Sequence, residues 1–296
     1  MFKPEGVFTA LITPMNTDET IHYQELRNQV ERQLAAEAAG LFCMGTNGEF
    51  YALSSEERLT STDIIIEQLN NRVPLIINIG CVTTQETIRL AKLTAKKRVD
   101  ALSIIAPYYA SLSQKQLYDH FAAVAHAVDI PVMVYNIPQR TGNAVSVETV
   151  EKLSHIDNVI GIKDSSGNVA HLDELLTLKS EEFSLLIGTD SLILETLIKG
   201  ATGAVAGCAN PFPQILNGIY DNWKKGNLAR AQQLQASIVP FRQTFSLSNP
   251  NSIVKRSVEL LGYPVGPARS PANIADPFID AHIHEAIKKV ELLAQE

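Results

Sequence analysis

The sequence predicts an α/β protein in which eight strand and helix pairs close a (β/α)8 barrel, followed by a C-terminal helical region. Eight short apolar segments recur before residue 211. In the stretches between them, apolar residues recur every three to four positions, as in a helix. No strand pattern follows Trp223. Near-continuous apolar strands that alternate with helices are typical of a parallel sheet covered on both faces, and eight such pairs close a barrel.

The predicted strands are short, and several are rich in β-branched residues. They span residues 6–13, 40–46, 74–80, 101–107, 131–136, 159–165, 183–190 and 203–210. Between them, residues such as Leu26, Val30 and Leu34 place apolar side chains on one helical face. A doubly wound open sheet is the alternative. It is disfavoured because no strand is followed by a Gly-x-Gly-x-x-Gly turn.

The prediction divides the chain into a catalytic barrel, residues 1–224, and a C-terminal helical region, residues 225–296. In the second region, apolar periodicity predicts helices over 228–245, 252–261 and 280–293. A stretch rich in proline and glycine, residues 262–271, joins the last two helices.

The composition excludes several classes of function. The net charge of -7 and the pI of about 5.6 argue against nucleic-acid and anionic-membrane partners, which need a concentrated basic face. No apolar run is long enough for a membrane span, and residues 2–15 are expected to form a strand rather than a signal peptide. The three cysteines are odd in number and lack metal-ligand spacing. A soluble cytoplasmic protein is therefore expected.

Lys163 is the most informative single residue. It interrupts the apolar run of residues 159–162, so its amine is projected from a strand predicted to be buried on both faces. Burial makes the charged form of a lysine less favourable, and the free amine is a nucleophile that forms a Schiff base with a ketone. The alternative interpretation is a strand-end lysine that reaches water or a carboxylate such as Asp164.

Other strand ends carry polar groups that the barrel would bring to the same mouth. A tyrosine beside the lysine, such as Tyr135, is a candidate general acid and base, and the Thr46 hydroxyl can relay a proton. The Gly-Thr-Asn-Gly turn of residues 45–48 can present backbone N–H groups to a carboxylate. A 2-oxo acid such as pyruvate supplies both the ketone and the carboxylate. Each feature also has a structural explanation, since such turns are common and tyrosines fill barrel rims.

These motifs resemble the dihydrodipicolinate synthase and N-acetylneuraminate lyase family of pyruvate-dependent class I aldolases, over essentially the whole chain. The resemblance rests on GTNGEF at 45–50, APYY at 106–109, YNIPQRTG at 135–142 and GIKDSSG at 161–167. Weaker support comes from IGTD at 187–190, GAVAGCAN at 203–210 and PNSIVKRSVELLG at 250–262.

The resemblance implies a role for each matching residue. Lys163 would form the Schiff base, and Tyr135 would be the acid and base beside it. Thr46 would connect Tyr135 to Tyr109, which in the family reaches across from a neighbouring subunit. A homo-oligomer is therefore expected, at least a dimer and commonly a homotetramer built as a dimer of dimers.

The resemblance also implies substrate-binding positions. The amides of Thr46 and Asn47 would hold the pyruvate carboxylate, and Gly188 and Val205 would lie near the bound keto acid. Arg140 occupies the place where the synthases recognise aspartate semialdehyde, so it favours a small acidic aldehyde as the second substrate.

Other positions favour a different member of the family. Asn47 and Phe50 replace residues usual in the synthases and are closer to aldolases acting on 4-hydroxy-2-oxoglutarate or 2-keto-3-deoxy sugar acids. Phe50, Tyr51 and Val82 fall where lysine-inhibited synthases often bind lysine, so feedback inhibition by lysine is not expected.

The function predicted is a class I lyase that condenses pyruvate with an acidic aldehyde, using a covalent Schiff base and no metal or organic cofactor. Retro-aldol cleavage of a 4-hydroxy-2-oxo acid is the main alternative, and a non-catalytic keto-acid-binding barrel is another. A pyridoxal phosphate enzyme would need a phosphate cradle that the sequence supplies only weakly. Metal-dependent chemistry is disfavoured, since His282 and His284 are two apart in a predicted helix and would not share a face.

Overall fold

The eight predicted strands form a closed barrel in the computed structural model, which describes residues 2–295. The strand order follows the chain from β1 to β8, and the described strand pairs are parallel. The strands are β1 Gly6–Ala10, β2 Gly40–Cys43, β3 Leu75–Asn78, β4 Ala101–Ile105, β5 Val132–Asn136, β6 Val159–Asp164, β7 Ser184–Ile187 and β8 Gly203–Ala206. The predicted fold class is confirmed.

Every residue of these strands is buried. This explains why the strands appear in the sequence as continuous apolar runs instead of an alternating pattern, because a parallel strand has neighbours on both faces. The few polar strand residues, among them Asn78, Ser103 and Lys163, must therefore be accommodated inside the protein.

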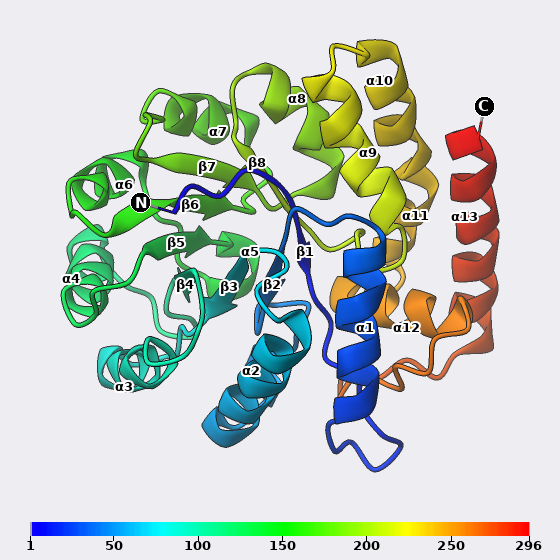
Figure 1. The fold of residues 1–296 in the computed structure, drawn as a ribbon, viewed down its shortest axis with the longest axis horizontal. Coiled ribbons are helices and arrows are strands. Elements are labelled where there is room, and N and C mark those ends of the chain that lie inside the picture. The colour runs from blue at the N-terminus through cyan, green and yellow to red at the C-terminus, as the bar shows by residue number, and fades with distance from the viewer. Residues whose placement is uncertain (1, 296) are drawn as a thin grey trace. The chain divides into compact units, whose positions relative to one another are not determined.

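The chain divides into two compact units, and the first contains residues 2–6 and 74–205. Helices α3, α4, α6 and α7 flank its strands (Figure 1). Serine side chains cap α4 and α6; Ser113 and Gln116 form a reciprocal capping box that fixes where α4 begins. The helical elements are α3 Thr84–Thr94, α4 Gln114–Ala125, α5 Pro138–Thr141, α6 Val147–Ser154, α7 Val169–Leu176, η2 Asp190–Leu192 and α8 Ile193–Ile198.

The second unit contains residues 7–73 and 206–295. Within it, α10 packs against both α9 and α13, which lie beside it in Figure 1. The helical elements are α1 Tyr23–Ala35, η1 Phe50–Ala52, α2 Ser55–Leu69, α9 Pro213–Lys224, α10 Leu228–Ser237, α11 Val239–Gln243, η3 Thr244–Ser246, α12 Pro250–Leu260 and α13 Pro277–Gln295. The predicted domain boundary coincides with the last residue of α9, but the division into two domains there stays a prediction.

One predicted helix is divided. The sequence predicted a single helix over 228–245, but α10 ends at Ser237 and a separate helix, α11, begins at Val239. Pro240 lies in the first turn of α11, where its missing N–H needs no partner. In a continuous helix, the same proline would remove a hydrogen bond and clash with the preceding turn.

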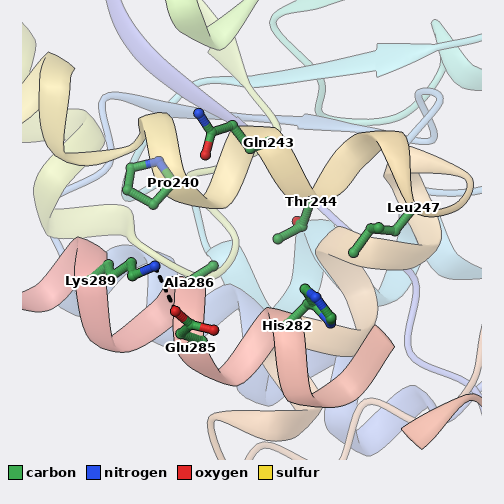
Figure 2. Close-up of a pocket in the computed structure, with 8 residues that line it drawn as sticks. All are labelled: Pro240, Gln243, Thr244, Leu247, His282, Glu285, Ala286 and Lys289. Atoms are coloured by element: carbon green, nitrogen blue, oxygen red, sulfur yellow. Dashed lines mark ion pairs between the residues drawn. The ribbon is translucent and has the colours of Figure 1, made fainter. Parts of the chain in front are cut away.

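A small pocket of about 170 Å³ lies between the α11–η3 segment and α13. Gln243, Leu247, His282 and Ala286 contribute to its lining, and an ion pair between Glu285 and Lys289 lies at its edge (Figure 2). Among residues 2–295, no helix is both long enough and apolar enough to cross a membrane.

Candidate active site

The orientation of Lys163 depends on an extra residue in β6. Val132 pairs with Val159, but the next residue of β5, Met133, pairs with Gly161, so Ile160 is inserted relative to β5. A shift of one residue reverses the face to which every following side chain points. The insertion therefore sets the register in which Tyr135 is the direct partner of Lys163.

The residues that follow this pair face the helices. Asn136 donates to Asp164 at 2.7 Å, and its oxygen accepts from the Val145 N–H at 3.1 Å. Asp164 also accepts from the backbone N–H and the hydroxyl of Ser166 at 2.9 and 2.6 Å. Because side chains alternate along a strand, Tyr135 and Lys163 point the opposite way, into the barrel.

Asp164 stays ionised although it is fully buried. Burial disfavours its charge, but contacts with His171, Ser166 and Asn136 hold the pKa of the carboxyl below its usual range. The His171 Nε2 lies 3.5 Å from the Asp164 carboxylate. This network connects the ends of β5 and β6 behind Tyr135 and Lys163 and fixes their relative position.

The Lys163 amine has a strongly altered proton affinity. Its side chain is only 3% exposed, and its Nζ lies 3.9 Å from the centre of the Tyr135 ring. Burial lowers the pKa of Lys163 to about 7, while the charge of Asp190 opposes that shift. A substantial fraction of free amine is therefore present near neutral pH, as a nucleophile that attacks a ketone requires.

The end of β7 leaves space for this lysine. A Cβ at Gly188 would lie 3.0 Å from the Lys163 Cε and would also clash with Ser165. A side chain at this position would therefore force Ser165 or the Lys163 side chain to move. Val205, the other predicted neighbour of the keto acid, is buried in β8.

Tyr109 is held away from its own chain. It is 99% exposed, and its φ of 78° lies in the left-handed region that non-glycine residues avoid. The buried Asn143 fixes the segment on both sides of it. The Asn143 amide donates to the carbonyls of Pro107 and Ala110 at 2.9 and 2.8 Å, and its oxygen accepts from the Leu112 N–H at 2.8 Å.

Arg140 is exposed on the short helix α5, which directly follows β5. The neighbouring Gln139 donates a hydrogen bond to the carbonyl of Ser166, in the loop that follows β6. This bond connects the arginine-bearing helix to the segment just beyond Lys163.

Thr46 and Asn47 belong to the second unit, in a tight turn after β2. The Glu49 N–H donates to the Thr46 carbonyl at 3.2 Å, and the Thr13 hydroxyl donates to the Gly48 carbonyl at 2.8 Å. The Asn47 side chain packs against Gly207, where a Cβ would lie 3.0 Å from its Nδ2. The turn therefore lies just beyond the end of β2, and its role in binding a carboxylate stays a prediction.

Several residues around the predicted site were not singled out from the sequence. Asp190 acts on Lys163 electrostatically, Asn143 fixes the Tyr109 segment, and Glu49 forms a buried ion pair with Lys255 at 2.8 Å. Asp190 could have been identified as a candidate site residue from its position just after β7. The Glu49 partner is 206 residues away in sequence, and no periodicity indicates such a pair.

The cysteines and the potential metal ligands form no further site among the described residues. Cys43 and Cys208 are buried and Cys81 is half-buried, and none forms a disulfide. Within residues 2–295, no three His, Cys, Asp or Glu side chains are grouped closely enough to hold a metal ion.

Comparison with known proteins places this chain in a family. The sequence model of the Dihydrodipicolinate synthetase family matches residues 3–290. The 4-hydroxy-tetrahydrodipicolinate synthase of Methanopyrus kandleri is 34% identical over 297 residues, which cover 99% of each chain. This protein therefore belongs to the Dihydrodipicolinate synthetase family, and it is a lyase.

Solved structures agree with this assignment. The 4-hydroxy-tetrahydrodipicolinate synthase of the thermoacidophilic methanotroph Methylacidiphilum fumariolicum superimposes with a TM-score of 0.94 at 29% identity, covering 99% of this chain and 98% of that one. YagE, an E. coli K12 prophage protein of the dihydrodipicolinic acid synthase family solved in complex with pyruvate, gives 0.93 at 28% identity, covering 97% and 99%.

Proposed function

We propose that this protein condenses pyruvate with aspartate semialdehyde through a Schiff base on Lys163. The observation that carries the proposal is the buried Lys163 amine, whose pKa is lowered to about 7 and which lies against the Tyr135 ring. The relatives named 4-hydroxy-tetrahydrodipicolinate synthase support this choice of reaction.

The chemistry follows from the position of the amine. The free Nζ attacks the keto carbon of pyruvate, and a proton delivered to the resulting hydroxyl allows water to leave as the imine forms. Loss of a proton from the pyruvate methyl group gives an enamine, whose carbon attacks the aldehyde. Tyr135 is the proton carrier in these steps, with Thr46 as its relay. Attack by the amino group of the condensed product on the imine carbon then releases Lys163.

Tyr109 completes the relay from a partner subunit in this proposal. Its 99% exposure and left-handed backbone support a side chain directed away from its own chain. The proposed assembly is at least a dimer, in which each copy supplies Tyr109 to the other, and two dimers would associate as a tetramer. Each complete site would then need two copies of the chain.

The substrate contacts are proposed from the two strand-end segments. The N–H groups of Thr46 and Asn47 would hold the pyruvate carboxylate, with Gly188 and Val205 beside the keto acid. Arg140 would bind the carboxylate of aspartate semialdehyde, since an exposed guanidinium offers two parallel donors to a carboxylate. The reaction needs no metal or organic cofactor, and we place the enzyme in the cytoplasm.

Covalent trapping tests the reaction class. Incubation with pyruvate and sodium borohydride should add one reduced pyruvate unit, and peptide mapping should locate it on Lys163. Lys163→Ala should remain folded and acquire no adduct. An adduct that persists in this variant, or none in the natural protein, would refute the assignment.

Substrate choice is tested by steady-state kinetics. Aspartate semialdehyde with pyruvate should be turned over far more efficiently than 4-hydroxy-2-oxoglutarate or 2-keto-3-deoxy sugar acids are cleaved. Arg140→Ala should raise the KM for aspartate semialdehyde much more than that for pyruvate. Faster cleavage of a 4-hydroxy-2-oxo acid would replace the proposed reaction by a retro-aldol reaction at the same lysine.

A further inference from the structure

The turn that carries Thr46 and Asn47 is bounded by two strained residues. Met44 has a φ of 55° and Glu49 a φ of 56°, both in the left-handed region. Such conformations persist in non-glycine residues only where surrounding contacts enforce them. Glu49 also closes the turn, because its N–H donates to the Thr46 carbonyl at 3.2 Å.

Glu49 is held by a buried ion pair and by a hydrogen bond from a backbone N–H. One carboxylate oxygen accepts from the Lys255 Nζ at 2.8 Å, and the other accepts from the Arg269 N–H at 2.8 Å. The Glu49 and Lys255 side chains are 2% and 1% exposed. A buried ion pair of this kind contributes little net stability, but it fixes geometry strongly because neither charge tolerates losing its partner.

Both partners of Glu49 are themselves fixed. Lys255 projects from the middle of α12. Arg269 forms hydrogen bonds with Glu57 at 2.8 Å and with the carbonyls of Ala52 and Glu19 at 2.6 and 2.7 Å. The end of the turn is therefore attached to a helix and to a loop that are both rigidly anchored.

We propose that the Glu49–Lys255 pair is the positioning device for the carboxylate-binding turn. The pair does not contact substrate; it holds Glu49 in its strained conformation, and this conformation sets the direction of the Thr46 and Asn47 peptide groups. The inference rests on the proposed function, in which those groups hold the pyruvate carboxylate. Loss of the pair should weaken the binding of pyruvate more than that of aspartate semialdehyde. The Lys163 amine should still be able to form the Schiff base.

The test is Glu49→Gln, which keeps the shape and the acceptor for the Arg269 N–H but removes the charge that Lys255 requires. The concentration of pyruvate giving half-maximal borohydride trapping should rise at least tenfold. The maximal extent of trapping and the KM for aspartate semialdehyde should change less than threefold. Lys255→Met removes the other member of the pair, and it should likewise raise the half-maximal pyruvate concentration while changing the KM for aspartate semialdehyde little.

Asp280→Asn is the matched control. Asp280 binds Arg256, the residue next to Lys255 on α12, at 2.5 Å, so its loss loosens the same helix without touching Glu49. It should leave the half-maximal pyruvate concentration unchanged. If Glu49→Gln does not fold, the comparison of Lys255→Met with Asp280→Asn decides the question.

The outcomes separate the two proposals. No trapping of the natural protein by pyruvate would overturn the proposed function. Normal trapping of the natural protein, with unchanged pyruvate dependence in the folded Glu49→Gln or Lys255→Met variant, would overturn the positioning role alone. Equal losses for pyruvate and aspartate semialdehyde, or a similar loss in Asp280→Asn, would reduce the pair to a general structural role and also overturn it.

Discussion

Two lysines are almost completely buried within residues 2–295, and their surroundings differ. Lys255 lies 2.8 Å from the Glu49 carboxylate, whereas Lys163 lies over the ring of Tyr135. Burial lowers the pKa of both amines. At Lys255 the adjacent carboxylate opposes that effect through both its charge and a hydrogen bond; at Lys163 the charge of Asp190 opposes it, and the pKa still falls to about 7.

The comparison indicates that burial alone would not give a lysine the role proposed for Lys163. A carboxylate within hydrogen-bonding distance keeps the buried amine protonated and makes it a structural cation. A ring face offers a weaker electrostatic attraction that cannot replace lost hydration. Since each lysine can be replaced by an apolar side chain of similar length, the two sites can be tested in parallel.

The largest difference is expected in activity. Lys163→Met should lower kcat by about 10⁴-fold or more, because no other group can replace the proposed covalent nucleophile. Steady-state assays with pyruvate and aspartate semialdehyde measure this effect. Lys255→Met should retain measurable turnover at saturating pyruvate. Comparable residual activity in the two variants would contradict the assignment of roles.

The two lysines should also differ in their effect on stability: Lys255→Met should destabilise the protein, whereas Lys163→Met should not. Lys255→Met leaves the Glu49 carboxylate buried without its cation, so the free energy of unfolding should fall by about 3–5 kcal/mol. Denaturant unfolding monitored by circular dichroism gives this value. Lys289→Met is the control: it breaks the exposed pair with Glu285 shown in Figure 2 and should change stability by less than about 0.5 kcal/mol. Equal effects of the two substitutions would show that burial of the Lys255 pair is unimportant.

Lys163→Met should instead stabilise the protein at neutral and acidic pH, by about 1–4 kcal/mol. The folded pKa of about 7 lies below the unfolded value of 10.5, so below pH 7 the folded state carries the full cost of a buried charge. Between pH 7 and 10.5 that cost declines, because the folded protein has released the proton that the unfolded chain retains. Unfolding curves at pH 6, 8 and 10 should show the gain shrinking as pH rises, and a constant gain would show that the buried charge is not its cause.

The smallest expected effect is that of Asp190→Asn on the pH dependence of imine formation. Imine formation at low pyruvate concentration should increase with pH through about 7 as Lys163 loses its proton. Asp190 favours the protonated amine, so Asp190→Asn should lower the pKa of Lys163 and move this inflection to lower pH. The pH dependence of the borohydride trapping rate measures it. An inflection that moves upward would exclude Asp190 as the opposing charge.

Most of the fold could be predicted from the sequence because each buried strand leaves an apolar run of characteristic length. The divided helix at residues 228–245 was missed because apolar spacing continues across the break, although Pro240 marks it. The candidate site could be predicted only in part. Lys163 and Tyr135 stand out as polar residues in apolar strands, but which face they share depends on the insertion of Ile160. The pairing of Glu49 with Lys255 likewise depends on packing between distant segments, which local pattern does not encode.

The inserted Ile160 has a consequence for the design of new aldolases. A lysine placed on a barrel strand at the right distance from its end faces the interior in one register and the helices in the other. Copying Lys163 and Tyr135 alone onto an idealised, bulge-free barrel would therefore put the amine on the wrong side of the strand. The transferable unit is the pair of neighbouring strands with their one-residue mismatch, together with the two side chains that this mismatch brings into register.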